Sequence, residues 1–234
     1  MYECNQFTRT ELALGKDGIE KLKNSKIVLF GLGGVGSYIA EALARVGIGN
    51  LIIVDGDTVD ITNINRQLIA NINTIGKNKA ELVKERISLI NPLANVVDIS
   101  KFVKSEDDID FIDETVDYVI DAIDDFDAKI MIIKKAKEIG LNLISSMGTA
   151  KRLHGDMFKI ADISKTKVCP LAKKMRRELK KLRINKVKVL YSDEVPTEMH
   201  EIDGYVGKSL GSVSFVPPVA GMLIAGEVVR DLLK

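Results

Sequence analysis

Short apolar runs alternate with segments of helical periodicity over the first 150 residues. Lys26–Phe30 is a run typical of a buried strand, and the apolar positions between Val35 and Val46 then repeat at helical spacing until Gly47. The same alternation predicts strands at 51–54, 96–99, 118–120 and 143–145, and helices at 77–90 and 128–139. Strands separated by helices need right-handed crossovers. The pattern therefore predicts an α/β fold with a doubly wound, mainly parallel Rossmann-like sheet and helices on both faces.

The pattern changes after Gly148. Strand-like runs at 157–161 and 187–191 bracket a helical segment at 170–182, which predicts an antiparallel extension of the sheet. Residues 193–210 have no periodicity, and we expect a mobile loop there. We therefore expect a single domain over 1–234, with a helical arm (1–25), an α/β core (26–150) and a C-terminal part (151–234) that ends in a helix.

Composition excludes several classes of protein. With 46% hydrophobic and 29% charged residues, the 234-residue chain can bury one sizeable core, which excludes disordered and fibrous classes. The net charge of +1 favours no partner, but its distribution is uneven. Residues 105–128 hold eleven carboxylates and no base, whereas 165–188 hold eleven bases and one acid. Cys4 and Cys169 are the only cysteines, so no disulfide framework or zinc ribbon is predicted.

Nothing in the sequence predicts export or membrane insertion. The N-terminal residues contain no apolar run of signal-peptide length, and acids occur at Glu3 and Glu11. The uncharged stretch 209–226 contains Pro217 and Pro218, and it is typical of a half-buried terminal helix rather than a membrane span. We expect a cytoplasmic protein with no membrane partner.

A glycine-rich motif lies between the first strand and its helix. Its glycines permit a tight turn, and they let backbone N–H groups approach a phosphate at the helix N-terminus. Asp55 ends the second strand 19 residues after the last of these glycines, where it can accept hydrogen bonds from a ribose. The motif predicts a nucleotide site, although an acid in this position is also part of the NAD fingerprint. The candidate glycines are Gly31, Gly33, Gly34 and Gly36.

The residues after Asp55 favour a triphosphate over a dinucleotide. Arg66 and Lys79 supply two positive charges, which suit a triphosphate whose α–β bond is being broken. Taken alone, Lys79 is typical of a solvated helix lysine. The further candidate nucleotide contacts are Asp57, Asn63, Asn65 and Gln67.

Three acids, Asp121, Asp124 and Asp125, follow the fourth predicted strand. Ligands in such folds bind outside the carboxyl ends of the strands, and Mg²⁺ takes one or two carboxylates together with phosphate oxygens. We choose Asp124 as the metal ligand because it lies past the strand end.

These motifs carry a resemblance. The segments GLGGVGS, DGDTVDITNINRQ, GKNKA and DAIDD are similar to those of the ubiquitin-activating-enzyme-like (ThiF/MoeB/HesA) adenylating superfamily. The resemblance implies that the glycine loop and Asp55 hold ATP, and that Asp124 holds Mg²⁺. It also implies phosphate binding by Asn63, Arg66 and Lys79.

The N-terminal segment Phe7-Thr8-Arg9 resembles the aromatic-x-Arg motif of the same superfamily. There the arginine reaches the triphosphate held by the other subunit of a dimer. The resemblance therefore implies a homodimer in which Arg9 completes the partner's site.

The chain departs from the activators of carrier proteins. Those of bacterial type usually carry two CxxC pairs for zinc, and this sequence has none. Cys169 stands beside a lysine-rich segment and is more typical of a structural thiol than of a nucleophile. Asp125 stands where those activators often have Asn, which leaves its role open.

Over nearly its whole length the chain resembles one branch, the tRNA threonylcarbamoyladenosine dehydratases. The similar segments are FTRTELALGKDG, SSMGTAKRL, ADISKTKVCPLAKKMRRELKK and VLYSDE. The resemblance implies that ATP activates the threonyl carboxylate on the adenosine beside the anticodon. The neighbouring amide then displaces AMP and closes a ring.

The basic segment supports this branch independently. Ala172, Met175, Leu179 and Leu182 form one apolar stripe, which leaves the bases on the other faces of the helix, where they can follow nucleic-acid phosphates. A merely solvated helix remains the alternative. The candidate tRNA-binding residues are Lys173, Lys174, Arg176, Arg177, Lys180 and Lys181.

Other functions stay open at this point. An adenylyltransferase for a sulfur-carrier protein ending in Gly-Gly is disfavoured by the missing CxxC pairs and by the basic helix. A nucleotide-sensing module and an NAD oxidoreductase are disfavoured by Arg66, Lys79 and Asp124. A monovalent cation and a sulfur-transfer or carrier protein partner are neither required nor excluded.

Overall fold

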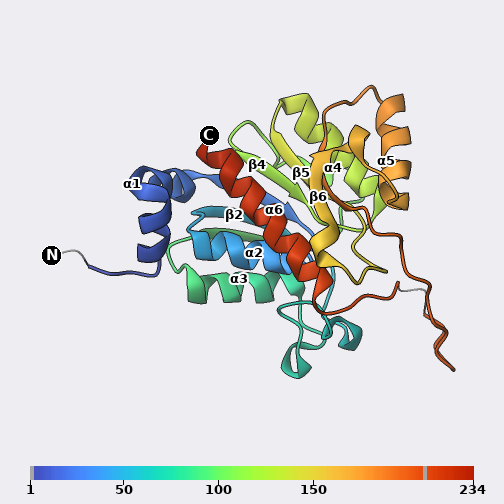
Figure 1. Ribbon diagram of the computed structural model, residues 1–234. Coiled ribbons are helices and arrows are strands. Elements are labelled where there is room, and N and C mark those ends of the chain that lie inside the picture. The colour runs from blue at the N-terminus through green and yellow to red at the C-terminus, as the bar shows by residue number, and fades with distance from the viewer. Residues whose placement is uncertain (1–2, 208–209) are drawn as a thin grey trace.

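A computed structural model describes residues 3–207 and 210–234. Its centre is a seven-stranded sheet in the order β3-β2-β1-β4-β5-β7-β6, parallel except for β6, which pairs antiparallel with β7 (Figure 1). The doubly wound sheet with an antiparallel extension is confirmed, and the predicted strand ends are each within one residue of those observed. The strands are β1 (Lys26–Phe30), β2 (Asn50–Val54), β3 (Asn95–Ile99), β4 (Tyr118–Asp121), β5 (Asn142–Ser146), β6 (Phe158–Asp162) and β7 (Lys188–Ser192).

Helices cover both faces of the sheet. One face carries α2 (Gly36–Val46), α3 (Lys79–Ile90) and α6 (Val216–Leu233), and the other carries α4 (Phe126–Ile139) and α5 (Pro170–Lys181). The N-terminal arm contains α1 (Thr8–Asn24), which packs against α6, as Figure 1 shows at its left. Short 3₁₀ helices lie in the connections at Ile61–Asn63, Ile72–Thr74, Glu106–Ile109, Gly155–Met157 and Ile163–Lys165.

The core forms because successive strand residues point to opposite faces of the sheet. In β1, Ile27 and Leu29 pack under α2 and α6, whereas Val28 and Phe30 pack under α4 and α5. All four side chains are fully buried. Burial on both faces explains why the strands read as continuous apolar runs rather than as an alternating pattern.

Local capping accounts for Asp125, whose role the sequence left open. Its carboxylate accepts a hydrogen bond from the N–H of Ala128 (2.8 Å), which makes Asp125 the N-cap of α4. Gly140 ends the same helix at a φ of 85°.

The segment between β7 and α6 has no helix or strand in its described residues, as predicted. Its mobility stays a prediction, and residues 208–209 of the expected loop lie outside the described residues. The two ends of the segment lie on either side of Lys151, because Lys151 N–H donates to Gly211 O (2.9 Å) and Thr197 N–H donates to Lys151 O (3.0 Å). Within 3–207 and 210–234, no helix is both long and apolar enough to cross a bilayer.

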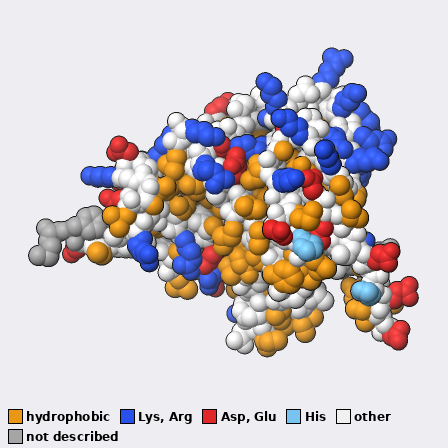
Figure 2. Space-filling view, viewed as in Figure 1, with side chains coloured by type: hydrophobic (Ala, Val, Ile, Leu, Met, Phe, Trp, Pro, Cys, Tyr) orange, Lys and Arg blue, Asp and Glu red, His pale blue; other side chains and the backbone are white. Residues whose placement is uncertain are grey.

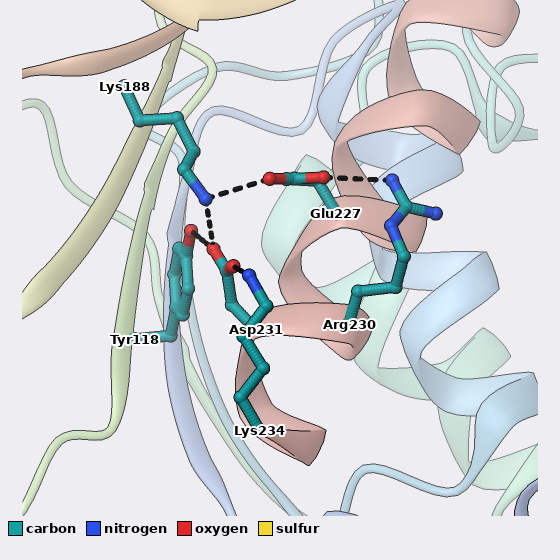
Figure 3. A network of polar contacts seen from close by, with 6 residues as sticks. All are labelled: Tyr118, Lys188, Glu227, Arg230, Asp231 and Lys234. Carbon is teal, nitrogen blue, oxygen red and sulfur yellow. Dashed lines mark hydrogen bonds and ion pairs between the residues drawn. The ribbon is translucent and has the colours of Figure 1, made fainter.

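A polar network fixes α6 at the amino ends of the strands (Figure 3). The Tyr118 hydroxyl donates to Asp231 (2.8 Å), and the Lys188 ammonium pairs with both Asp231 and Glu227. Burial alone would raise the pKa of Asp231, but hydrogen bonds from Lys188, Lys234 and Tyr118 lower it to about 2. Asp231 is therefore ionised at neutral pH and holds the last turns of α6 to β4 and β7.

Candidate nucleotide-binding site

The carboxyl ends of three strands bring the predicted site together. Phe30 at the end of β1 is paired with Val54 of β2 on one side and with Asp121 of β4 on the other. The next residue of each strand therefore lies at one edge of the sheet. These residues begin the glycine loop, the Asp55 segment and the segment that contains Asp124.

The glycine loop needs two of its glycines for steric reasons. Gly31 has a φ of 84°, and a Cβ there would lie 2.7 Å from backbone atoms of Ala122. A Cβ at Gly36 would lie 1.7 Å from Gly31 O. At Gly33, by contrast, an added Cβ would meet only Gln67 Nε2, at 3.8 Å. The protein itself does not require a glycine at Gly33, so the space in front of it is free for a ligand to approach the backbone.

Asp55 joins the second strand to the glycine loop. Its carboxylate accepts hydrogen bonds from Leu32 N–H (2.6 Å) and Asp57 N–H (2.8 Å). Burial raises the pKa of Asp55, although Lys79 and these N–H groups act in the opposite direction. Asp55 thus orients the loop in addition to being the predicted ribose acceptor.

Lys79 is not the solvated lysine that its sequence context alone would suggest. Only 4% of it is exposed, and its ammonium pairs with the carboxylate of Asp57 at 2.9 Å. It is the first residue of α3, where the helix dipole disfavours a cation. In this structure Asp57 is the partner that holds it.

Arg66 and Asn65 lie over the other side of the loop. The Arg66 Nη1 donates to Thr62 O (3.0 Å) and Asn65 Oδ1 (2.9 Å), and its Cγ would lie 3.2 Å from a Cβ at Gly34. Among the described residues, Nε and Nη2 of Arg66 have no acceptor, so part of the guanidinium fork remains available to a ligand.

Two amides complete this side of the site. Asn63 Oδ1 accepts a hydrogen bond from Asp60 N–H (3.1 Å), which leaves its NH₂ group for another partner. Gln67 is buried, and its Oε1 has no hydrogen-bond partner in the described part of the chain. The predicted nucleotide contacts therefore converge on one edge, with free donors and acceptors among them.

Asp124 and Asp121 have different environments, although both belong to the DAIDD motif. Asp124 is exposed, and no hydrogen bond or ion pair to it is found within the described ranges. Asp121 is fully buried and pairs with the ammonium of Lys129 at 2.9 Å. Lys129 also donates to Ile123 O (2.9 Å), immediately before Asp124.

The buried pair of Asp121 and Lys129 was missed in the sequence. Ser145 of β5 donates a further hydrogen bond to the Asp121 carboxylate (2.5 Å), so the cluster joins β4, β5 and α4. The signal that could have revealed it is a lysine at a position of α4 that the helical spacing assigns to the core.

Arg9 does not lie at the nucleotide site of its own chain. The ring of Phe7 packs on Gly47, 3.5 Å from where its Cβ would lie, at the end of α2 that is opposite to the glycine loop. The eleven residues of α2 span about 16 Å, which is longer than an arginine side chain. The exposed Arg9 is therefore remote from the nucleotide site of its own chain, and its predicted role in the site of a partner subunit stays a prediction.

The basic helix is confirmed as α5, and Figure 2 shows Lys and Arg side chains gathered over it at the upper right. Ala172, Met175 and Leu179 are buried, but the prediction for Leu182 is wrong, because it caps the helix and is 42% exposed. Arg176 also differs from expectation. Its guanidinium turns back to donate to the carbonyl oxygen of Thr166 (2.9 Å).

The other bases of α5 differ in whether their side chains contact another residue of the protein. Lys174 lies over the ring of Phe126 at 3.6 Å, and Lys181 pairs with Glu178 at 2.7 Å. Lys173, Arg177 and Lys180 are exposed and have no such partner among the described residues.

A glycine loop at a helix N-terminus, a carboxylate after the second strand and two nearby cations define a nucleotide-binding α/β protein. A family model described as the ThiF family matches residues 7–234, and the chain belongs to that family. The tRNA threonylcarbamoyladenosine dehydratase of Bacillus subtilis (strain 168) is 46% identical to it, over 98% of this chain and 95% of that protein.

Solved structures agree with this likeness. The crystal structure of the E. coli tRNA N6-threonylcarbamoyladenosine dehydratase TcdA in complex with AMP matches with a TM-score of 0.89 and 30% identity, covering 97% of this chain and 94% of that one. The ATP complex of the same enzyme matches with a TM-score of 0.88 and 29% identity, covering 97% and 93%.

Proposed function

We propose that the protein is an ATP-dependent tRNA threonylcarbamoyladenosine dehydratase. The observation that carries this proposal is the convergence of the glycine loop, the cations Arg66 and Lys79 and the exposed carboxylate of Asp124 on one sheet edge. Similarity to enzymes of that name along almost the whole chain supports the particular substrate.

ATP fits this edge with its phosphates at the N-terminus of α2. The backbone N–H groups of the glycine loop and the dipole of α2 favour the phosphates, and Asp55 accepts hydrogen bonds from the ribose. Arg66 and Lys79 neutralise the charge that develops when the α–β bond breaks. For Lys79 to reach a phosphate, its ion pair with Asp57 has to open.

The residues present also fit Mg²⁺. Asp124 is exposed, and its carboxylate has no protein partner in the described ranges. One carboxylate with phosphate oxygens is a common Mg²⁺ environment. When bound, the ion would neutralise phosphate charge. The pair of Asp121 and Lys129 fixes the turn that presents Asp124.

The proposed reaction has two steps. A carboxylate oxygen of the threonyl group attacks the α-phosphorus, so that a new O–P bond forms while the bond to pyrophosphate breaks. A nitrogen of the neighbouring carbamoyl group then attacks the activated carbonyl carbon, loses its proton and displaces AMP. The ring closes, and one water is lost overall.

Mass spectrometry of nucleosides tests this function. Modified tRNA incubated with the protein, ATP and Mg²⁺ should yield a nucleoside lighter by one water, and the variant Asp124→Asn should yield little of it. Unchanged threonylcarbamoyladenosine, together with adenylation of a carrier protein ending in Gly-Gly, would instead support an adenylyltransferase that activates carrier proteins.

We also propose a homodimer in which Arg9 serves the partner's site. Arg9 is exposed and separated from its own glycine loop by the length of α2, which supports a role in trans. If Arg9→Ala and Asp124→Ala are each inactive, mixing the two proteins should restore about a quarter to half of wild-type activity, because each heterodimer contains one intact site. Absence of recovery, after subunit exchange is verified by mass spectrometry, would exclude action in trans.

The basic face of α5 is our candidate for the tRNA-binding surface. The charges that face solvent lie on one helix, and the apolar stripe of that helix is buried. Replacing Lys173, Lys174, Arg177 and Lys180 together by Gln should weaken binding of all tRNAs alike. Each lost phosphate contact should reduce the slope of log K against log salt by about 0.7–0.9.

The matched control for this experiment is ATP affinity, which should not change. Filter binding or fluorescence anisotropy at several salt concentrations measures the slope. Unchanged tRNA affinity with an unchanged slope would mean that the basic face is only solvated.

A further inference from the structure

Unpaired buried side-chain atoms collect at one edge of the sheet. Within the described residues they are Gln67 Oε1, Nε and Nη1 of Arg152, and Asp193 Oδ1. These three residues lie on the connections that leave the carboxyl ends of β2, β5 and β7. Buried polar groups are normally hydrogen-bonded, so unpaired ones at the ligand-binding edge indicate groups that a ligand completes. Gln67 belongs to the nucleotide site described above, but Arg152 does not.

Arg152 is a buried cation for which residues 3–207 and 210–234 supply no counterion. It is only 3% exposed, and a guanidinium cannot lose its charge in a protein. Neither of the two acids that follow β7 pairs with the Arg152 guanidinium. Glu194 accepts hydrogen bonds from Leu153 N–H (2.9 Å) and His154 N–H (3.2 Å), and Asp193 pairs with Lys159. A buried charge left unpaired is costly, so its retention points to an anionic ligand.

The backbone places Arg152 near the phosphate-side residues. Lys151 N–H donates to Gly211 O (2.9 Å), and the side chain of Asn65 donates to Ser212 O (2.9 Å). Gly211 and Ser212 are consecutive residues, so their Cα atoms are about 3.8 Å apart. Lys151 and Asn65, which bond to them, are therefore held close to the same point of one segment. Arg152 therefore follows a residue that is tied, through this segment, to the immediate neighbour of Arg66.

We propose that Arg152 binds the carboxylate of the substrate, which under the proposed function is the threonyl carboxylate of the modified adenosine. The planar guanidinium fork suits a carboxylate held by two parallel hydrogen bonds. The nucleotide phosphates already face the glycine loop, Arg66 and Lys79. A side chain this deeply buried is out of reach of the phosphates along an RNA backbone, whereas a carboxylate at the end of a flexible nucleoside substituent can project into the protein.

In this position Arg152 acts in both the adenylation and the ring closure of the proposed reaction. Arg152 first holds both carboxylate oxygens; one of them then leaves the guanidinium to attack the α-phosphorus, while the other keeps its hydrogen bond. When the O–P bond forms and pyrophosphate leaves, the carboxylate loses its negative charge. The hold of Arg152 then weakens, and the carbonyl carbon is free for ring closure.

The test compares Arg152→Gln and Arg152→Lys with the wild type. Arg230→Gln is the matched control, because Arg230 is an exposed arginine paired with Glu227 on α6. Binding is measured for one tRNA with and without its threonylcarbamoyl group, and single-turnover rates are measured at saturating ATP. In Arg152→Gln, the preference for the modified tRNA should fall about 10- to 10²-fold, the scale of a charge-assisted hydrogen-bonded pair. Affinities for ATP and for unmodified tRNA should stay within about twofold of the wild type.

Two further readouts separate binding from a structural role. Because Arg152 is unpaired without substrate, Arg152→Gln should leave the melting temperature unchanged or raise it, and Arg152→Lys should restore part of the preference. Arg230→Gln should retain full activity.

The outcomes that overturn the proposal are distinct. Weaker ATP binding would assign Arg152 to the nucleotide, and equal weakening for both tRNAs would assign it to the RNA backbone. A large fall in melting temperature without rescue by lysine would make it structural. Full activity of Arg152→Gln would overturn only this inference, whereas a wild-type protein that leaves modified tRNA unchanged would overturn the proposed function itself.

Discussion

Replacing Arg66 by alanine is expected to slow adenylate formation by roughly 10²-fold or more, the scale for removing a preorganised charge from a transition state. The fold should tolerate this change, because the Arg66 guanidinium donates only to Thr62 O and Asn65 Oδ1, both within its own loop. Pyrophosphate release in a single turnover measures the rate, and a thermal melt checks the fold.

Asn65→Ala is the appropriate control, since it removes the neighbour of Arg66 without removing a positive charge. It should slow the reaction much less than Arg66→Ala does. If Arg66→Ala retained most of its activity, Arg66 would be a structural residue of the loop, and neutralisation of the phosphates would fall to Lys79 and Mg²⁺.

Two substitutions in the glycine loop should have opposite consequences for stability and binding. Gly36→Ala places a Cβ 1.7 Å from Gly31 O, so the backbone must move, and we expect a loss of unfolding free energy of about 4 kcal/mol or more. Gly33→Ala meets only the end of the Gln67 side chain at 3.8 Å, so the fold should be retained. The new methyl group would instead occupy the space of a phosphate and weaken ATP binding by about tenfold or more.

Denaturant unfolding and calorimetric ATP titration of both variants measure these effects. Each variant serves as the control for the other, because the two differ only in which glycine gains a methyl group. Tight ATP binding by Gly33→Ala would show that the phosphates do not approach this part of the loop.

The sheet was predictable because its strands are buried on both faces and leave unbroken apolar runs, with glycines and caps marking the helices between them. Local motifs also sufficed to gather Asp55, Arg66 and Asp124 at one edge, because the carboxyl ends of parallel strands must meet there. The environment of Lys79 was not predictable. Its burial depends on Asp57, which approaches it across a β–α connection.

Arg152 left no signal in the sequence for a related reason. It stands in an irregular segment whose partners, Glu194 and Gly211, come from beyond β7. The orientation of Arg176 was likewise set by tertiary contact. Its position away from the apolar stripe predicted an exposed base, but the carbonyl oxygen of Thr166 is close enough to accept a hydrogen bond from its guanidinium. Such pairings depend on how distant segments approach, which neither periodicity nor spacing encodes.

Helix α6 runs between the carboxyl ends and the amino ends of the strands, and it is fixed at both. Near its first turn, Pro217 would contact a Cβ at Gly34 at 3.1 Å, and near its last turn Asp231 is fixed by Tyr118 and Lys188 (Figure 3). The eighteen residues between its ends span about 27 Å. Loss of the contact from Tyr118 or Lys188 to Asp231 can therefore tilt α6 and shift the glycine loop from a distance. Reduced nucleotide affinity in such a variant would result from displacement of α6 and not from a missing contact with the nucleotide.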